Sequence, residues 1–246
     1  VLNQHFQTYG LQRVEMKLKS AAALCGHLAV MFTPIGLWAL IRKRHWFLTA
    51  WVGMFFAAAL ALFFAGSARY LLPLAAPFAL IVALQYRERP ALLWTCFGLQ
   101  LALGMGLAWA NYDHWDGYRR FIDETRKVTA GRRVWVNGEW GLRYYAEAEG
   151  ALPIVRGQVL RPGDFVIDSA LAERIPFTTG GGQLVEQLRR EITPRLPLRI
   201  IGLGVKSGYS SVGFGLRPFD VSTAPADVVT LSVIVERAPE LEWLPM

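Results

Sequence analysis

Acidic residues are almost absent from the first part of this chain. Of the 19 Asp and Glu residues among 246, none lies between Glu15 and Glu88. That stretch consists largely of apolar runs, and a fourth run follows it: Leu24–Ile41, Trp46–Gly66, Leu71–Tyr86 and Ala91–Ala110. A water-soluble domain cannot bury four such segments, whereas a helix of about 20 apolar residues crosses the hydrocarbon core of a bilayer. The first half of the chain is therefore predicted to lie in a membrane.

The predicted fold is an α-helical transmembrane bundle of about four spans followed by a small α/β extracytoplasmic domain. It has three segments: an interfacial amphipathic segment at residues 1–20, transmembrane helices at 21–111 and the α/β domain at 112–246. The third apolar run is short and contains Pro73 and Pro77, so it is either a full span or a tilted, partly re-entrant helix.

Cysteine and histidine are scarce. The two cysteines, Cys25 and Cys96, both lie within apolar runs, which excludes a disulfide framework in the polar half and matches no zinc-binding spacing. The four histidines are scattered along the chain without metal-ligand spacing. No metal and no cofactor are predicted.

The excess of positive charge is confined to the membrane half. The net charge is +7, and residues 1–112 account for all of it with nine Lys and Arg against two acids, 9 − 2 = +7. Residues 113–246 carry 17 of each sign and are neutral. Basic residues that flank apolar runs set topology and meet anionic lipid headgroups, so the predicted partner is the lipid bilayer and not nucleic acid.

The basic residues also predict an orientation. The turn at 42–44 carries three Lys or Arg and the turn at 87–89 carries two, whereas the turn at 67–70 carries only Arg69. The positive-inside rule places the first two turns in the cytoplasm and the polar half outside. The predicted location is the bacterial inner membrane, with several passes and an extracytoplasmic C-terminal domain.

Alternating short elements are predicted in the polar half, which indicates a small α/β layer closed by antiparallel strands. The predicted helices are Trp115–Ala130, Gly141–Ala148 and Gln183–Ile192. The predicted strands are Arg133–Asn137, Leu152–Val155, Gly163–Asp168, Leu198–Leu203 and Val228–Glu236. Gly180–Gly182 follows no obvious strand and lacks the lysine of a P-loop, so it is interpreted as a loop.

Two carboxylates lie where the last apolar run meets the polar half. Asp113 and Asp116 form either an interfacial acid pair or N-caps of the helix predicted from Trp115. Aspartate at a helix start accepts hydrogen bonds from unpaired backbone N–H groups, which favours the capping interpretation.

Arg69 and Tyr70 are the candidate ligand-binding residues. An arginine at the outer end of a membrane helix can hold a phosphate through two parallel hydrogen bonds, and a neighbouring tyrosine can donate another. The competing interpretation is a snorkelling arginine beside an interfacial tyrosine, which is the commoner arrangement at the ends of membrane helices.

The phrase Arg69-Tyr70-Leu71-Leu72-Pro73-Leu74-Ala75-Ala76-Pro77, followed by an apolar run, a basic turn and another apolar run, resembles a known pattern. It is similar to the C-terminal membrane segment of GT-C glycosyltransferases, which include protein O-mannosyltransferases and the bacterial lipid A aminoarabinose transferase. Two later phrases also resemble the extracytoplasmic tails of bacterial members: residues 161–168 (RPGDFVID) and 209–219 (YSSVGFGLRPF).

The resemblance implies a cell-envelope hexosyltransferase that moves a sugar from a polyprenyl-phosphate donor to an extracytoplasmic acceptor, with Arg69 and Tyr70 at the donor phosphate. The catalytic aspartate of that family lies in its first extracytoplasmic loop, which this sequence does not contain. The chain is therefore expected to be a C-terminal fragment that needs the N-terminal part of the same protein. The alternative is a non-catalytic, membrane-anchored module for periplasmic binding or assembly.

Overall fold

A computed structural model describes residues 41–42, 45–62, 72–207, 209 and 217–237. The chain divides into two compact units: residues 1–109 with 197–222, and residues 110–196 with 223–246. Each unit is described by itself below.

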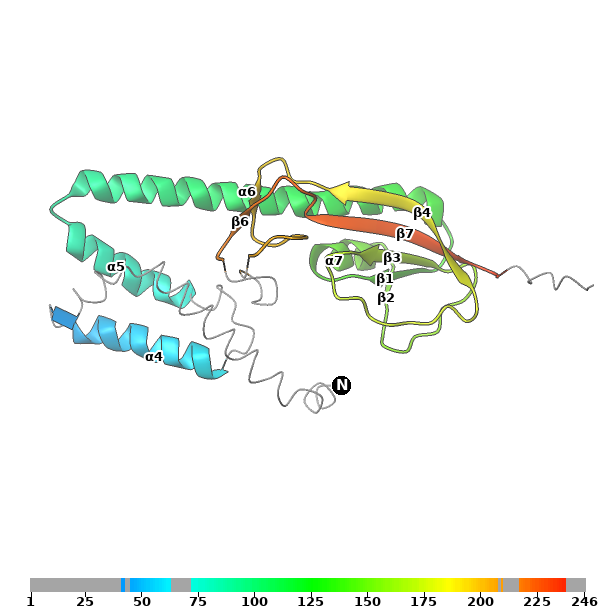
Figure 1. The fold of residues 1–246 in the computed structure, drawn as a ribbon, viewed down its shortest axis with the longest axis horizontal. Helices are drawn as coiled ribbons and strands as arrows, with labels where there is room; N and C mark the ends of the chain where they lie inside the picture. The colour runs from blue at the N-terminus through cyan, green and yellow to red at the C-terminus, as the bar shows by residue number, and fades with distance from the viewer. Residues whose placement is uncertain (1–40, 43–44, 63–71, 208, 210–216, 238–246) are drawn as a thin grey trace, which may run out of the picture. The chain divides into compact units, whose positions relative to one another are not determined.

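The described part of the first unit contains two short apolar helices that pack against each other, α4 (Trp46–Leu62) and α5 (Ala75–Tyr86) (Figure 1). They contain 17 and 12 residues, fewer than a helix needs to span the hydrocarbon core comfortably. The same unit holds a two-stranded ribbon of β5 (Leu198–Arg199) and β6 (Asp220–Val221). The predicted strand over 198–203 is therefore shortened to two residues.

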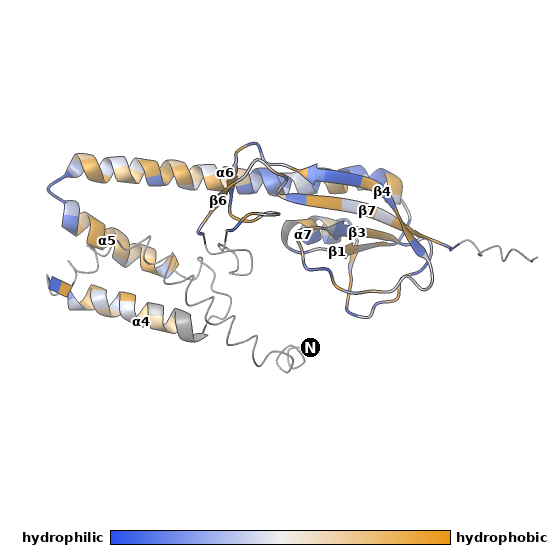
Figure 2. Ribbon diagram, viewed as in Figure 1, coloured by the Kyte–Doolittle hydropathy of each residue, from blue (hydrophilic) through white to orange (hydrophobic). Residues whose placement is uncertain are grey.

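One helix, α6 (Pro90–Thr129), is much longer than the others. It contains 40 residues, and Pro90 occupies its first position, where a missing N–H is tolerated. Its first half is hydrophobic and its second half hydrophilic, as Figure 2 shows. The apolar window is not buried by the rest of the protein, so its length and composition allow it to cross a membrane. Separate helices ending at 110 and starting at 115 were predicted, and α6 instead continues through this junction.

The prediction of a four-span helical bundle is wrong. In the described residues, only α6 is both long and apolar enough to cross a membrane. The described parts of the second and third predicted spans form α4 and α5, which are shorter than a helix that crosses a membrane. The first predicted span lies outside the described residues except for Ile41. A single candidate span supports membrane association, and the predicted multi-pass arrangement is not supported.

The second unit is built on a mixed five-stranded sheet in the order β2-β1-β3-β7-β4. The strands are β1 (Val134–Asn137), β2 (Leu152–Pro153), β3 (Phe165–Ser169), β4 (Gln183–Ile192) and β7 (Asp227–Val235). Strands β2, β1 and β3 are parallel, whereas β7 runs antiparallel to both β3 and β4.

Different layers cover the two faces of this sheet. On one face, the second half of α6 and helix α7 (Trp140–Ala148) pack over Val136, Ile167 and Leu231. On the other face, Trp135, Val166 and Ile234 are buried under loop residues that include Ile154, Leu160 and Phe177. This two-sided burial explains why β1 and β3 are apolar without the polar alternation of a half-exposed strand.

Strand β4 corrects the helix predicted over Gln183–Ile192. Its pairing with β7 shifts between Glu186 and Leu188, which marks a β-bulge. Val185, Leu188 and Ile192 pair with positions 233, 231 and 227 of β7, whose side chains all point to the helix-covered face. The extra residue of the bulge gives these three a spacing of three and then four, which imitates helical periodicity.

Candidate functional site

Most of the site residues predicted from the sequence do not form a common site in the described part of the structure. Arg69 and Tyr70 lie outside the described residues. Asp113 and Asp116 lie in the interior of α6, so their predicted role as N-caps is wrong. The Asp113 carboxylate instead accepts a hydrogen bond of 2.7 Å from the backbone N–H of Arg195.

The Asp116 carboxylate is occupied by two neighbours on α6. It lies 2.7 Å from Nη2 of Arg119 and 3.1 Å from Nε of Arg120. The carboxylate is thus held by two guanidinium groups along the helix, which does not leave an acid poised to act as a base. Gly180–Gly182, which was predicted to be a loop, lies directly before β4 and has positive φ at its first two residues.

A buried polar network joins α6 to the sheet. Tyr118 Oη donates to Asp227 Oδ2 at 2.7 Å, and Ser169 Oγ donates to the same oxygen at 2.6 Å. Asp227 Oδ1 accepts from the backbone N–H groups of Leu171, at 2.9 Å, and Val228, at 2.7 Å. Asp227 therefore receives four hydrogen bonds although it is fully buried, and each donor favours its charged form.

The hydroxyl proton of Tyr118 decides which atom is the donor in the contact between Tyr118 and His114. The single hydroxyl proton of Tyr118 is directed to Asp227, so the 3.0 Å contact between Tyr118 Oη and Nε2 of His114 requires that Nε2 carries a hydrogen and donates it. Burial raises the pKa of Tyr118 above its ordinary value, and the adjacent Asp227 charge adds to that rise. Burial likewise raises the pKa of Asp227, while its hydrogen bonds to Ser169 and Tyr118 offset part of the rise.

This network is structural. The hydroxyl proton of Ser169 goes to Asp227, and its oxygen accepts from the N–H groups of Leu171 and Ala172 at 3.2 Å each. A serine with its proton and lone pairs so engaged, and only 2% exposed, cannot attack a substrate. The network instead fastens the helix that carries the apolar segment to strands β3 and β7.

The carboxyl end of β1 is the position where a ligand site is expected in this fold. From β1 the chain passes through α7 to β2 on one side, and then crosses to β3 on the other side. In open α/β sheets, ligands bind beyond the carboxyl ends of the strands at the point where strand order reverses in this way. Asn137 and Asp168 end or nearly end the two strands that meet there, and they are paired in register.

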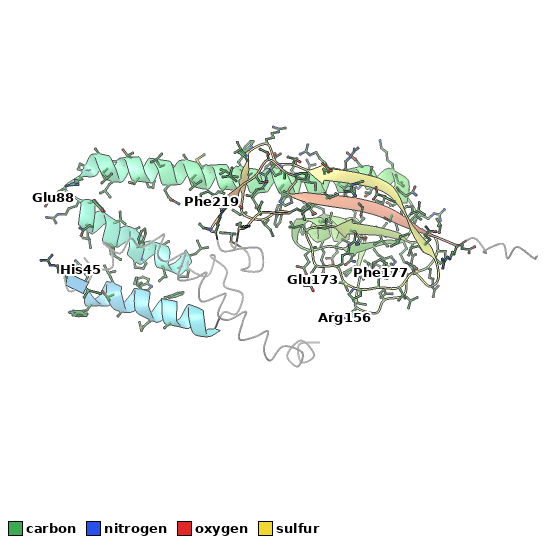
Figure 3. All side chains as sticks on the ribbon, in the orientation of Figure 1. His45, Glu88, Arg156, Glu173, Phe177 and Phe219 are labelled. Atoms are coloured by element: carbon green, nitrogen blue, oxygen red, sulfur yellow. The ribbon has the colours of Figure 1, made fainter. Side chains whose placement is uncertain are left out.

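Asn137 holds the loop that closes this edge. Its amide nitrogen donates to the carbonyl of Ile175 at 3.2 Å, and its amide oxygen accepts from the N–H of the same residue at 2.9 Å. The loop after β3 is thus clamped over the sheet, while Glu173 on that loop is exposed to solvent (Figure 3).

Asp168 lies beneath the same loop with one oxygen unused. Its side chain is 9% exposed, and Oδ1 accepts no hydrogen bond from any residue that the structure describes. The Nε atom of Arg174 lies 3.9 Å from Oδ1, beyond hydrogen-bond distance. Burial raises the pKa of Asp168, and the Arg174 charge and the neighbouring Asn137 amide offset part of that rise. A ligand hydroxyl or ammonium group is the chemistry that would satisfy this atom.

Sequence reasoning did not single out Asn137 or Asp168. The available signal was a polar residue at the end of an apolar strand in two segments that form neighbouring strands, residues 134–137 (VWVN) and 165–168 (FVID).

Among the described residues, no group of three or more His, Cys, Asp or Glu side chains could hold a metal ion. In comparisons with known proteins, the chain matches no family model, no curated protein and no solved structure.

Proposed function

We propose that this chain is the C-terminal part of a membrane glycosyltransferase that transfers a sugar from a polyprenyl-phosphate donor to an extracytoplasmic acceptor. The structural observation that supports the proposal is the continuity of α6. Its apolar half is exposed, and its polar half is packed into the sheet of the second unit. Such a helix keeps a folded domain at the membrane surface, where the head of a lipid-linked donor is accessible.

The donor side of the proposal rests on the resemblance of the phrase that begins at Arg69. In this proposal Arg69 binds the donor phosphate through its planar guanidinium group and Tyr70 adds a hydrogen bond. The catalytic aspartate would come from the N-terminal part of the same protein. The domain would lie outside the cytoplasm, as the basic turn at 87–89 indicates.

The acceptor side of the proposal rests on the edge formed by β1 and β3. The unused Oδ1 of Asp168 is a buried hydrogen-bond acceptor at the position where α/β sheets bind ligands. A glycan or another hydroxyl-rich acceptor would supply the missing donor. This role for Asp168 requires no residue from the membrane segment.

The experiment is a transfer assay with membranes that contain the complete protein. Release of labelled sugar from a polyprenyl-phosphate hexose, with the mannose donor tried first, is compared between wild type and Arg69→Lys. The lysine keeps the charge but loses the two-point contact, so transfer should fall about ten-fold, equivalent to about 1.4 kcal/mol. Arg87→Lys, at another helix end, is the matched control and should retain transfer. Equal transfer by Arg69→Lys and wild type would return Arg69 to the snorkelling role.

A second candidate function is a membrane-anchored binding module without catalysis. The observation that favours it is that the Asp168 edge lies entirely within the second unit. Under this alternative, glycan binding would be lost in Asp168→Asn, and no sugar transfer would be detected with any polyprenyl-phosphate donor. Transfer activity in the complete protein would exclude it.

A further inference from the structure

The segment of residues 197–222, which contains β5 and β6, interrupts the sheet unit in the sequence. It follows residue 196 and precedes residue 223, which both belong to the second unit, yet it is part of the first unit with residues 1–109. Leu198 of β5 lies so close to α6 that a Cβ atom at Gly106 would be 2.9 Å from its Cδ1 atom. The segment therefore packs against the apolar half of α6.

The position of Gly106 on α6 gives this contact a depth. Gly106 precedes Ala110, the last residue of the apolar run, by four residues, which is about 6 Å along a helix axis. Trp109 and Tyr112 are exposed on the same stretch of α6. Exposed aromatic side chains at the end of an apolar helix mark the boundary between hydrocarbon and headgroups. Where α6 crosses a membrane, Leu198 therefore lies at the edge of the hydrocarbon core.

Val221 provides apolar surface at the same depth. It is the partner of Leu198 in the antiparallel pairing of β5 and β6. Opposed residues of an antiparallel pair point to the same face, so Val221 points to the face on which Leu198 meets α6. Val221 is nevertheless 63% exposed. Lipid that covers this side chain together with the apolar half of α6 would remove both surfaces from water.

The polar groups around Val221 are satisfied within the segment. The Asp220 carboxylate accepts hydrogen bonds from the backbone N–H groups of Lys206, at 2.8 Å, and Val221, at 2.9 Å. It also accepts a hydrogen bond of 2.8 Å from the guanidinium of Arg217. Non-helical backbone is tolerated at membrane depth where the protein itself supplies its hydrogen-bond partners. These contacts therefore suit a segment that lies at the membrane boundary.

The segment is also basic. Residues 197–222 contain three Lys or Arg and one Asp, 3 − 1 = +2. Arg199 is buried, whereas Lys206 and Arg217 are exposed. The backbone N–H of Arg217 donates to the carbonyl of Lys206 at 3.1 Å, which holds these two basic residues next to each other. Exposed basic residues at a membrane surface attract anionic lipid headgroups.

We propose that residues 197–222 enter the headgroup layer of the membrane at the polar end of the apolar half of α6. Val221 contacts acyl chains there, and Lys206 and Arg217 bind the phosphates of anionic phospholipids. The proposal rests on the membrane placement of α6, which is part of the proposed function. It adds a second contact between the protein and the bilayer, and it involves neither the donor residues nor Asp168.

The test is lipid quenching of a fluorophore on single-cysteine variants of the full chain in nanodiscs. Cys25 and Cys96 are replaced by serine, and an environment-sensitive dye is attached to Val221→Cys. The phospholipids carry a nitroxide near the top of the acyl chain, so the dye should lose most of its emission. Val128→Cys is the matched control, because Val128 is also exposed and lies about 27 Å beyond Ala110 along α6. Its dye should keep its emission.

A third position separates failure of this proposal from failure of the membrane placement. Met105 is exposed in the apolar half of α6, so a dye on Met105→Cys should be quenched where α6 crosses the bilayer. Quenching at Met105→Cys without quenching at Val221→Cys would overturn the proposal while α6 stays a membrane helix. Emission retained at both positions would overturn the proposal together with the membrane placement of α6.

The headgroup contact is tested by the charge of the lipid. Quenching at Val221→Cys should be stronger in nanodiscs of phosphatidylglycerol, which is anionic, than in those of phosphatidylcholine, which has no net charge. Lys206→Gln should reduce this difference, whereas Lys127→Gln, at an exposed lysine near the end of α6, should preserve it. Equal quenching in the two lipids, or equal effects of the two glutamine variants, would overturn the proposed contact with anionic headgroups.

Discussion

Tyr118 and Asp227 are 109 positions apart in the sequence, yet the Tyr118 hydroxyl donates a hydrogen bond of 2.7 Å to the Asp227 carboxylate. Both side chains are almost completely buried. The contact joins the second half of α6 to the first residue of β7. It therefore holds the second half of α6 against the sheet of the second unit.

Removal of this one hydroxyl should destabilise the second unit. Tyr118→Phe leaves Asp227 with three of its four donors and removes the acceptor of the His114 Nε2 hydrogen bond. A hydrogen bond to a charged group contributes about 1.5–3 kcal/mol, so the free energy of unfolding should fall by that amount. Denaturant unfolding of the detergent-solubilised chain checks it. The control is Tyr144→Phe, at an exposed tyrosine on α7, which should change stability by less than about 0.5 kcal/mol. Equal effects of the two variants would show that the network contributes little.

Asp168→Asn should stabilise the protein at neutral pH. Because burial raises the pKa of Asp168, the folded state binds this proton more tightly than the unfolded state does. Wild-type stability then falls as the pH rises from the ordinary aspartate pKa through the raised one, and the asparagine variant lacks that fall. Unfolding measured across this pH range should show the largest gain above the raised pKa and almost none at low pH. A gain of equal size at every pH would contradict the assignment.

The close approach of α6 to β4 depends on Gly117. A Cβ atom there would lie 2.6 Å from Cγ2 of Ile192, whereas one at Gly104 would meet nothing within 4 Å. Gly117→Ala should therefore cost about 1–3 kcal/mol of unfolding free energy, and Gly104→Ala should be close to neutral. Combining Gly117→Ala with Ile192→Ala should cost less than the sum of the two single changes, as measured in a double-mutant cycle. Simple additivity would show that the two residues do not touch.

The sequence correctly predicted the helices and strands whose apolar residues follow a single pattern of spacing. Strands β1, β3 and β7 and helix α7 were each placed within two residues at either end, because their apolar runs are bounded by turn residues. Strand β4 was mistaken for a helix because a bulge changes its spacing. The continuity of α6 was missed because Asp113 and Asp116 resemble a helix start, while residues 111–116 contain no glycine or proline to break the helix.

The candidate site was less accessible to sequence reasoning than the fold. The proximity of Asn137 and Asp168 depends on the register of two parallel strands that are 31 positions apart, which no local pattern encodes. The burial of Asp168 depends on a loop that Asn137 clamps in place. Arg69 and Tyr70, the proposed donor-binding residues, were singled out by residue type and by the resemblance, and they lie outside the described residues.

The central claim is that α6 crosses the membrane and holds the sheet unit outside the cytoplasm. Glu88 and Arg156 are both exposed, the first just before α6 and the second on the loop-covered side of the sheet (Figure 3). Each is changed to cysteine in a background where Cys25 and Cys96 are replaced by serine, and spheroplasts are treated with a membrane-impermeant maleimide. The account predicts that Arg156→Cys is labelled in intact spheroplasts and that Glu88→Cys is labelled only after lysis. Labelling of both before lysis, or of Glu88→Cys alone, would contradict it.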